Sequence, residues 1–195
     1  MYDFPFWCDN EDMRILAVDD GGFSVWPPSK RKGKTLLVGM ITLGVKIEKV
    51  LLARVSVDGL DVTAKIIDMV KNERAKPDSV FLASISYAGF NLVDIMQLYD
   101  QVRIPIIVAN KEKPREGAVE AALFHHFPDW QERLKIIERA GKPMKLPIDG
   151  KTLYGYIVGI SEEEVRKVLE KLVVFGNLPE PLRIAHILAG ALSKC

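Results

Sequence analysis

The hydrophobic pattern of this chain changes its period near residue 60. Before that point, apolar and charged residues alternate over 45–57, with Lys49 as the exception, which is the pattern of a strand with one exposed face. Shorter apolar runs at 15–18 and 36–41 precede this segment. The gap between the second and third runs is too short for a crossover helix, so these runs are predicted to form an antiparallel hairpin.

Beyond that point, apolar residues at helical spacing alternate with short buried runs. Helices are predicted to begin near 62, 92 and 118, and strands are predicted over 80–85 and 104–109. Alternation of strand and helix indicates that this part of the sheet is parallel. Three antiparallel strands followed by helix, strand, helix, strand and helix is the order of a ribonuclease H-like, mixed α/β sheet flanked by helices.

The last third of the chain is predicted to add one strand and three helices, two of them C-terminal to the strand. The expected ranges are 130–141, 153–160 for the strand, 161–172 and 181–192. Ser161 and Glu164 form a capping box, and Pro181 suits the first position of the final helix. The stretch 143–149 most resembles a linker, but no domain boundary is placed. Residues 1–195 are therefore predicted to form a single domain.

The composition excludes several classes of protein. Hydrophobic residues make up 48% and charged residues 27% of the chain, which suits a folded core and argues against wholesale disorder. No apolar run reaches the roughly 20 residues of a membrane span, and the N-terminus does not resemble a signal peptide. Cys8 and Cys195 do not make a disulfide framework, which favours a reducing, cytoplasmic location. The formal net charge is +1, so any nucleic-acid-binding surface has to be local.

Several aspartates follow predicted strands or begin predicted helices. They are Asp19, Asp20, Asp58, Asp61 and Asp94. In α/β sheets, sites gather at the carboxyl ends of the strands. Clustered carboxylate oxygens are ligands for Mg²⁺ or Mn²⁺, and such an ion positions water and polarises a phosphodiester. The sequence therefore predicts a candidate metal site at one edge of the sheet.

Structural roles are the alternative for most of these acids. Asp61 and Asp94 stand at helix starts, where a carboxylate caps the helix and meets its dipole. Asp58 precedes a glycine and suits a turn as well as a ligand. Asp19 is the stronger functional candidate, because it directly ends a buried strand and two glycines follow that let the backbone approach a ligand. Asp20 either joins it or faces solvent.

Basic, aromatic and histidine residues supply further candidates. A basic tip between the first two strands consists of Lys30, Arg31, Lys32 and Lys34. This tip either holds phosphates, with Trp26 or Phe23 stacking on a base, or is a solvated hairpin. His186 is expected to pack or to form a hydrogen bond, with a metal role as the alternative. The aromatic segment 2–7 packs either on its own core or on a second copy, which leaves a homodimer open.

Five segments resemble, in order, the motifs of one protein family. The segments are Ala17–Phe23, Val57–Thr63, Ala88–Ile95, Ala121–Leu123 with His126–Pro128, and Pro179–His186. They span nearly the whole chain. The family is the mainly archaeal one called domain of unknown function 99, which is considered a relative of endonuclease V.

The resemblance implies a ribonuclease H-like fold and a metal-dependent nuclease site that uses Mg²⁺ or Mn²⁺. Endonuclease V nicks DNA or RNA near deaminated purines such as inosine. By this resemblance Asp19 matches a metal-binding aspartate, and the acid after the third strand matches Asp58 or Asp61. The candidate catalytic residues are therefore Asp19, Asp58 and Asp61. The candidate metal ligands are Asp19, Asp20, Asp58 and Asp94.

One position departs from the family pattern. Where the family usually keeps a metal-binding aspartate at the end of the fourth strand, this chain has Ala83, followed by Ser84. Ala83 cannot bind a cation, and Ser84 is a weak neutral donor. No segment matches the strand-separating wedge of endonuclease V. Arg183 resembles a family residue and is expected to pair with an acid or with a nucleic-acid phosphate.

The sequence is compatible with three functions. The first is a nucleic-acid-interacting protein, acting on DNA or RNA, with a depleted metal site and weak or no nuclease activity. The second is an active Mg²⁺- or Mn²⁺-dependent endonuclease for deaminated DNA or RNA, which uses Asp19, one of Asp58 or Asp61, and Asp94. The third is a non-catalytic scaffold or small-ligand-binding protein that reuses the fold.

Overall fold

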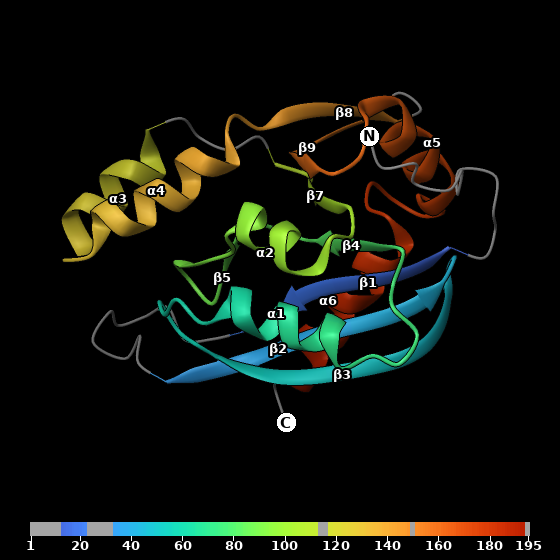
Figure 1. Cartoon of the computed structure of the whole chain (residues 1–195), viewed down its shortest axis with the longest axis horizontal. Coiled ribbons are helices and arrows are strands. Elements are labelled where there is room, and N and C mark those ends of the chain that lie inside the picture. Colours follow the sequence, from blue (N-terminus) through green and yellow to red (C-terminus); the bar gives the residue numbers. More distant parts are fainter. Residues whose placement is uncertain (1–12, 23–32, 113–116, 149–150, 194–195) are drawn as a thin grey trace.

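The computed structural model describes residues 13–22, 33–112, 117–148 and 151–193. These residues form a seven-stranded sheet, a separate two-stranded hairpin, and helices (Figure 1). The strands are β1 (Arg14–Asp20), β2 (Lys34–Leu43), β3 (Lys46–Ser56), β4 (Ser79–Leu82), β5 (Ser86–Tyr87), β6 (Asn91–Leu92), β7 (Ile106–Asn110), β8 (Met144–Ile148) and β9 (Lys151–Val158). The helices are α1 (Val62–Lys71), α2 (Ile95–Val102), α3 (Ala118–His126), α4 (Trp130–Ala140), α5 (Glu162–Leu172) and α6 (Glu180–Leu192).

The strands of the large sheet are ordered β3-β2-β1-β4-β7-β9-β8. The first three strands pair antiparallel, and β4 and β7 extend the sheet parallel to β1. This arrangement confirms the predicted ribonuclease H-like sheet, to which β9 and β8 add two antiparallel strands. Because β1, β3, β4 and β7 run in one direction, their carboxyl ends meet along one side of the sheet. We call this side, formed by residues 19–22, 56–61, 83–90 and 110–112, the strand-end edge.

Two hydrophobic cores lie on opposite faces of the large sheet. Val18 of β1 belongs to the core under α1 and α2, whereas Ala17 belongs to the core under α5 and α6. Figure 1 shows α1 and α2 in front of the strands and α6 behind them. Successive residues of a strand point to opposite faces. Asp19 therefore continues the face covered by α6, and Asp20 continues the face covered by α1.

The stretch 143–149, which resembles a linker in sequence, contains the edge strand β8 instead. Leu146 and Ile148 are buried in the core under α5. Pro147 between them is exposed, as an edge strand allows because its N–H side needs no partner. The two prolines of this segment hide a short alternation that is typical of a strand.

A β-bulge lies next to Lys49, the residue that interrupts the alternation of the third strand. The register of β3 against β2 shifts between Ile41 and Thr42, so that Lys49 pairs with Ile41 and Ile47 pairs with Thr42. Glu48 is thus the one extra residue on β3, and it places Ile47 on the opposite face from Lys49. Lys49 stays on the face of Leu51, and its ammonium pairs with Glu73 at 2.7 Å. The predicted hairpin between the second and third strands is confirmed.

The helices are short and begin close to their predicted positions. The capping box of Ser161 and Glu164 is present at the start of α5, as predicted. Pro181 occupies the second rather than the first position of α6, which begins at Glu180. In the part of the chain that the structure describes, no helix combines the length and the apolar character that crossing a membrane requires.

Candidate functional site

Asp19 and Asp20 end β1 at the strand-end edge, beside the end of β4. Val18 pairs with Leu82, and the N–H of Ala83 donates to the carbonyl of Val18 at 3.2 Å. Ala83, the residue directly after β4, therefore lies next to Asp19, and both belong to the edge at which the sequence predicts a candidate site. The position beside Asp19 contributes a methyl group and no third carboxylate.

Asp19 is buried and hydrogen-bonded to a histidine of the last helix. The residue is only 7% exposed, and its Oδ2 lies 2.8 Å from Nδ1 of His186. The His186 side chain is 72% exposed, so the buried carboxylate of Asp19 is hydrogen-bonded to a side chain that contacts solvent. Burial raises the pKa of Asp19, although hydrogen bonds from the Asp20 N–H and from His186 oppose the rise. The expected packing or hydrogen-bonding role of His186 is thus realised as a hydrogen bond.

Asp20 faces the opposite side of the sheet and binds the loop after β5. Its Oδ2 accepts a hydrogen bond from the N–H of Ala88 at 2.7 Å. Burial, followed by the nearby charge of Asp19, raises the pKa of Asp20 to about 6. The Tyr87 hydroxyl donates to the carbonyl of Val18 at 3.0 Å, and burial raises its pKa as well. The end of β1 therefore holds two poorly solvated carboxylates, and the charge of Asp19 further disfavours ionisation of Asp20.

We call Asp19, Asp20 and His186 the Asp19 cluster. The cluster is not a ready metal centre, because His186 engages one oxygen of Asp19 and the Ala88 N–H engages one oxygen of Asp20. Across the described residues, no group of three or more His, Cys, Asp or Glu side chains is placed to hold a metal ion. The Mg²⁺ or Mn²⁺ site that the family resemblance implies therefore does not fit these side chains as they stand.

The hydrogen bonds of Asp58 hold two loops of the strand-end edge together. Its N–H donates to the carbonyl of Ala88 at 2.8 Å, and its Oδ1 accepts from the N–H of Phe90 at 2.9 Å. Ala88 thus lies between Asp58 and Asp20, which it also contacts. Asp58 has a φ of 56°, which is unfavourable for a residue other than glycine. A Cβ at Gly89 would lie 2.2 Å from Oδ1 of Asp58, so this close approach requires glycine.

Asp61 occupies the N-cap position of α1, but its side chain does not cap the helix. Its carboxylate accepts hydrogen bonds from the N–H and hydroxyl of Ser56 and from Nδ2 of Asn91. Burial works to raise the pKa of Asp61, but the bonds from Asn91 and Ser56 outweigh it and lower the pKa. The buried Asn91 caps α1 in its place, because its Oδ1 accepts a hydrogen bond from the Val62 N–H at 3.1 Å.

Arg133 of α4 fastens these loops together, and sequence reasoning missed it. The residue is 4% exposed, and its guanidinium donates to the carbonyls of Asp58, Gly59 and Phe90 at 2.9, 3.1 and 2.6 Å. It also pairs with Asp129. Within an amphipathic helix an arginine usually faces solvent, so only its partners 74 and 75 residues away reveal its role. We call the connected set the Asp58 network, comprising Asp58, Asp61, Asn91 and Arg133.

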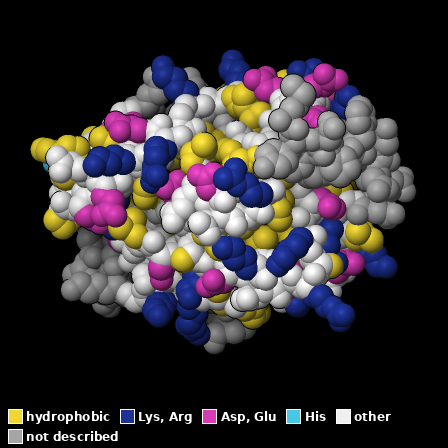
Figure 2. All heavy atoms as spheres, viewed as in Figure 1, with side chains coloured by type: hydrophobic (Ala, Val, Ile, Leu, Met, Phe, Trp, Pro, Cys, Tyr) yellow, Lys and Arg dark blue, Asp and Glu magenta, His cyan; other side chains and the backbone are white. Residues whose placement is uncertain are grey.

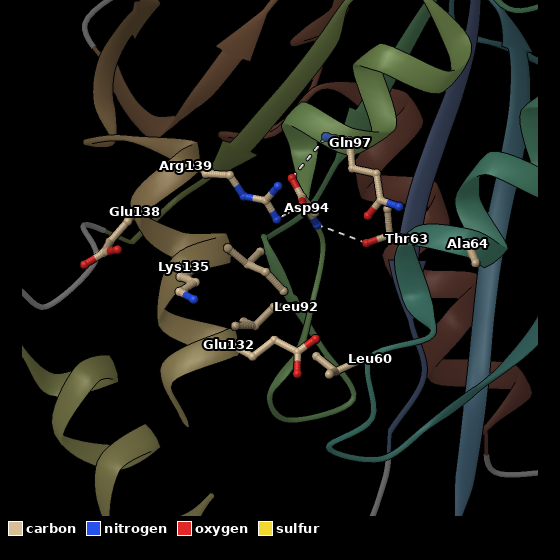
Figure 3. A pocket seen from close by; sticks show the side chains of 11 residues that line it. Leu60, Thr63, Ala64, Leu92, Asp94, Gln97, Glu132, Lys135, Glu138 and Arg139 are labelled. Carbon is tan, nitrogen blue, oxygen red and sulfur yellow. Dashed lines mark hydrogen bonds and ion pairs between the residues drawn. The ribbon is translucent and has the colours of Figure 1, made fainter. Parts of the chain in front are cut away.

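Asp94 has a different set of contacts, in a cavity of about 670 Å³ between α1, α2 and α4 (Figure 3). Its Oδ1 accepts from the N–H of Gln97 at 3.0 Å, which confirms the predicted capping role. Figure 3 shows Arg139 of α4 reaching toward Asp94, and the two residues form an ion pair. Asp94 is therefore engaged as a cap and an ion-pair partner, which leaves it poorly placed to bind a metal.

Of the predicted nucleic-acid-binding residues, the structure describes Lys34 and Arg183. Lys34 is exposed at the start of β2, paired with Ser56, and so lies at the strand-end edge. Arg183 makes two hydrogen bonds to the carboxylate of Glu180, at 2.7 and 2.6 Å, so its partner here is an acid. The other candidates lie outside the described residues: Phe23, Trp26, Lys30, Arg31 and Lys32.

A second cavity, of about 790 Å³, opens at the carboxyl ends of β4 and β7. Its wall includes Ser84 and Phe90 from the loops after β4, Asn110 at the end of β7, and Tyr154 of β9. The volume falls in the usual range of small-molecule sites. Ser84 directly follows Ala83, so the cavity begins one residue after the position beside Asp19. We call it the strand-end cavity.

Comparison with known proteins identifies the family. The family model for endonuclease dU matches residues 11–193. The chain belongs to this family. The UPF0215 protein of Thermococcus gammatolerans is 40% identical over 183 residues, which cover 93% of this chain and 92% of that protein. A crystal structure of a protein of unknown function from Archaeoglobus fulgidus has a TM-score of 0.81 at 32% identity and covers 92% of this chain and 98% of that chain.

The endonuclease dU family shares its fold with endonuclease V. Endonuclease V of Ciona intestinalis, in complex with a 23mer DNA containing an inosine, has a TM-score of 0.60 at 12% identity. The match covers 98% of this chain and 88% of that chain. At such low identity the likeness shows the fold alone. It confirms the predicted ribonuclease H-like architecture and the structural relation to endonuclease V.

Proposed function

We propose that this protein binds DNA containing a deaminated base along the strand-end edge, and that it hydrolyses phosphodiesters slowly or not at all. The name of its family, endonuclease dU, points to deoxyuridine as the base. The complex of Ciona intestinalis endonuclease V with inosine-containing DNA supports a nucleic-acid ligand for this fold. The expectation of slow or absent hydrolysis rests on one observation, Ala83 in the position beside Asp19.

The low hydrolytic activity follows from the charges available at the end of β1. Metal-assisted hydrolysis of a phosphodiester needs carboxylates that hold the ion against water and align the attacking water. Ala83 supplies no carboxylate, and the described residues contain no group of three ligands. Asp20, whose pKa is raised to about 6, is partly protonated near pH 6. A protonated Asp20 donates a hydrogen bond to a phosphate oxygen instead of repelling it.

The strand-end cavity supports recognition of a base that has left the helix. Its volume of about 790 Å³ exceeds that of a nucleobase, and Phe90 and Tyr154 offer aromatic surface in its wall. Asn110 and Ser84 offer polar groups for the edge of a base. A base bound there would lie beside the loop that follows Ala83, which places its strand along the same edge of the sheet as Asp19.

The alternative function is an active metal-dependent endonuclease. It is favoured by one observation, the meeting of Asp19, Asp20 and His186 at the end of β1. A cation at this point would stabilise the charged forms of both buried carboxylates, whose pKa values are raised chiefly by burial. In this alternative, His186 has to release Asp19 before the carboxylate can bind an ion.

A cleavage assay with matched variants separates the two functions. Native protein, Ala83→Asp and the neutral control Ala83→Asn are incubated with Mn²⁺ and strands that contain deoxyuridine, inosine or neither. We expect slow or no cleavage by native protein and by Ala83→Asn, and a gain of cleavage in Ala83→Asp because the missing carboxylate is restored. Fast cleavage by native protein that Asp19→Ala abolishes would establish the active endonuclease instead.

A binding assay tests the nucleic-acid half of the proposal. Fluorescence anisotropy with labelled strands should show salt-dependent binding, since neutralised phosphates release counterions. Duplexes with deoxyuridine should bind more tightly than the same duplexes with thymidine. Absence of binding to any strand would refute the proposal and leave the scaffold or small-ligand function.

A further inference from the structure

We propose that the tip of the α3–α4 hairpin is a stacking platform for an unpaired base of the bound strand. The tip consists of Phe124, His125, His126, Phe127 and Trp130, and we call it the aromatic tip. This inference rests on the proposed nucleic-acid function and extends it beyond the Asp19 cluster and the strand-end cavity.

Phe124 is the part of the aromatic tip that is free to receive a base. Its side chain is 60% exposed, and its ring meets those of His125 and Trp130 at interplanar angles of 75° with centroids 5.4 Å apart. Neither ring is stacked parallel on Phe124, and most of the Phe124 side chain faces solvent. The exposed part of the ring is therefore open to stacking by a planar base.

The aromatic residues of this tip are not needed for the cores of the sheet. Leu123 is the one buried residue of α3, whereas Phe124 and both histidines are exposed. Figure 2 shows hydrophobic side chains gathered at the rim of the molecule where α3 and α4 project, with a histidine visible beside them. Most of the viewed face carries interspersed basic and acidic side chains instead. The tip is thus a local, aromatic and imidazole-bearing surface.

The aromatic tip is joined to the strand-end edge by fixed contacts. The Phe127 ring lies 5.2 Å from the Phe90 ring, and the guanidinium of Arg133 lies 4.4 Å above Phe127. Arg133 and the Phe90 N–H in turn bind Asp58 at the strand-end edge. A chain of packed groups therefore holds the tip at a set position relative to the candidate site, as recognition of one strand at two points requires.

The chemistry of the tip favours an unpaired base over a protein partner. A base stacks on any aromatic face, and alanine substitution of such a platform weakens binding by roughly 5- to 100-fold for each base. The exposed imidazoles of His125 and His126 offer N–H groups to the phosphate that follows the base. A protein interface instead needs about 800 Å², or roughly 20–30 residues, on each partner, whereas the aromatic tip consists of the five residues named above.

The test compares two exposed phenylalanines. Phe124→Ala is measured beside Phe175→Ala, which removes an equally exposed ring, 65% accessible, from the segment after α5. Binding to a labelled single strand and to a duplex with an unpaired base is followed by anisotropy. We expect Phe124→Ala to lose roughly 5- to 100-fold in affinity and Phe175→Ala to keep the native value. Phe124→Leu should also lose affinity, whereas Phe124→Trp should retain it, because stacking needs a π face.

A fluorescence readout makes the location of the base explicit. In a Trp7→Phe, Trp26→Phe background, Trp130 is the sole tryptophan, and a stacked base should quench it on binding. Native-like affinity in Phe124→Ala, or equal losses in Phe124→Ala and Phe175→Ala, would overturn the inference while leaving the proposed function intact. Failure of the native protein to bind any strand would overturn both. A concentration-dependent mass in light scattering that Phe124→Ala abolishes would assign the tip to a second copy instead.

Discussion

The strand-end edge holds two groups of carboxylates that differ in how their charges are satisfied. In the Asp58 network, Asp61 accepts hydrogen bonds from three donors, and its pKa is lowered. In the Asp19 cluster, burial outweighs the available hydrogen bonds, and the pKa values of Asp19 and Asp20 are raised. Both groups follow strands of the same sheet and contact the same loop through Ala88.

The difference separates acids that build the edge from acids that are available for chemistry. Hydrogen bonds that favour the charged carboxylate stabilise the folded protein, whereas a desolvated carboxylate costs stability and is kept where a ligand or a proton relieves it. We therefore infer that Asp58 and Asp61, despite their place in a family motif, shape the loops. We also infer that Asp19 and Asp20 are the acids that take part in any reaction at the strand-end edge.

The largest effect is expected where the Asp58 network is broken at its centre. Arg133→Ala should lower the free energy of unfolding by about 3–5 kcal/mol, because a buried charged donor is lost and three carbonyl groups are left unpaired. Urea denaturation measures this change. Lys135→Ala, at an exposed position of the same helix, is the control and should change stability by less than about 0.5 kcal/mol. A loss below about 1 kcal/mol in Arg133→Ala would show that the network is not stabilising.

A smaller loss is expected for the acid of the same network. Asp61→Ala should cost about 2–3 kcal/mol, since Ser56 and the buried Asn91 lose their acceptor. The pKa of Asp61 is lowered on folding, so its contribution is present above the unfolded pKa and is lost as the pH falls through the folded pKa. The gap between native and variant should therefore narrow below about pH 4. A gap that does not change with pH would mean that the charge of Asp61 is irrelevant.

Much of the fold follows from hydrophobic period alone. The switch from alternation to helical spacing near residue 60 is enough to predict five strands of the large sheet, β1, β2, β3, β4 and β7, and the antiparallel pairing of β2 with β3. Elements without a long periodic pattern are missed. The two-residue strands β5 and β6 are too short to carry a period, and Pro143 before β8 and Pro147 within it disguise its alternation.

For the candidate site, the sequence predicts only the features that follow from the direction of the strands. Asp19 and Ala83 are expected at one end of the sheet because each stands at the end of a strand, and the structure places them there. The partner of Asp19 was not identified, since His186 is 167 residues away on a helix whose spacing suggests packing. The capping of α1 by Asn91 rather than by Asp61 was also missed, because it depends on which of two loops brings its side chain closer to the first turn of α1.

The Asp19 cluster is tested by removing one of its charges while keeping the hydrogen bond. Asp20→Asn retains an oxygen that accepts from the N–H of Ala88 but cannot ionise. We expect the variant to be more stable than native protein by about 1–2 kcal/mol at pH 7. The full shift of the Asp20 pKa to about 6 corresponds to about 3 kcal/mol, and partial access of water reduces the effect. Thermal or urea unfolding from pH 4 to pH 8 measures the difference.

The pH dependence of the stability difference shows whether burial of the Asp20 carboxylate destabilises the folded protein. Its folded pKa is raised, so between about pH 4 and pH 6 the folded state binds more protons than the unfolded state, and native stability falls as the pH rises. The advantage of Asp20→Asn should therefore grow across this interval and stay constant above about pH 7. Asp68→Asn, at an exposed position of α1, should show no such trend. If Asp20→Asn is less stable than native protein at pH 7, Asp20 is a well-satisfied structural acid, and the contrast between the two groups fails.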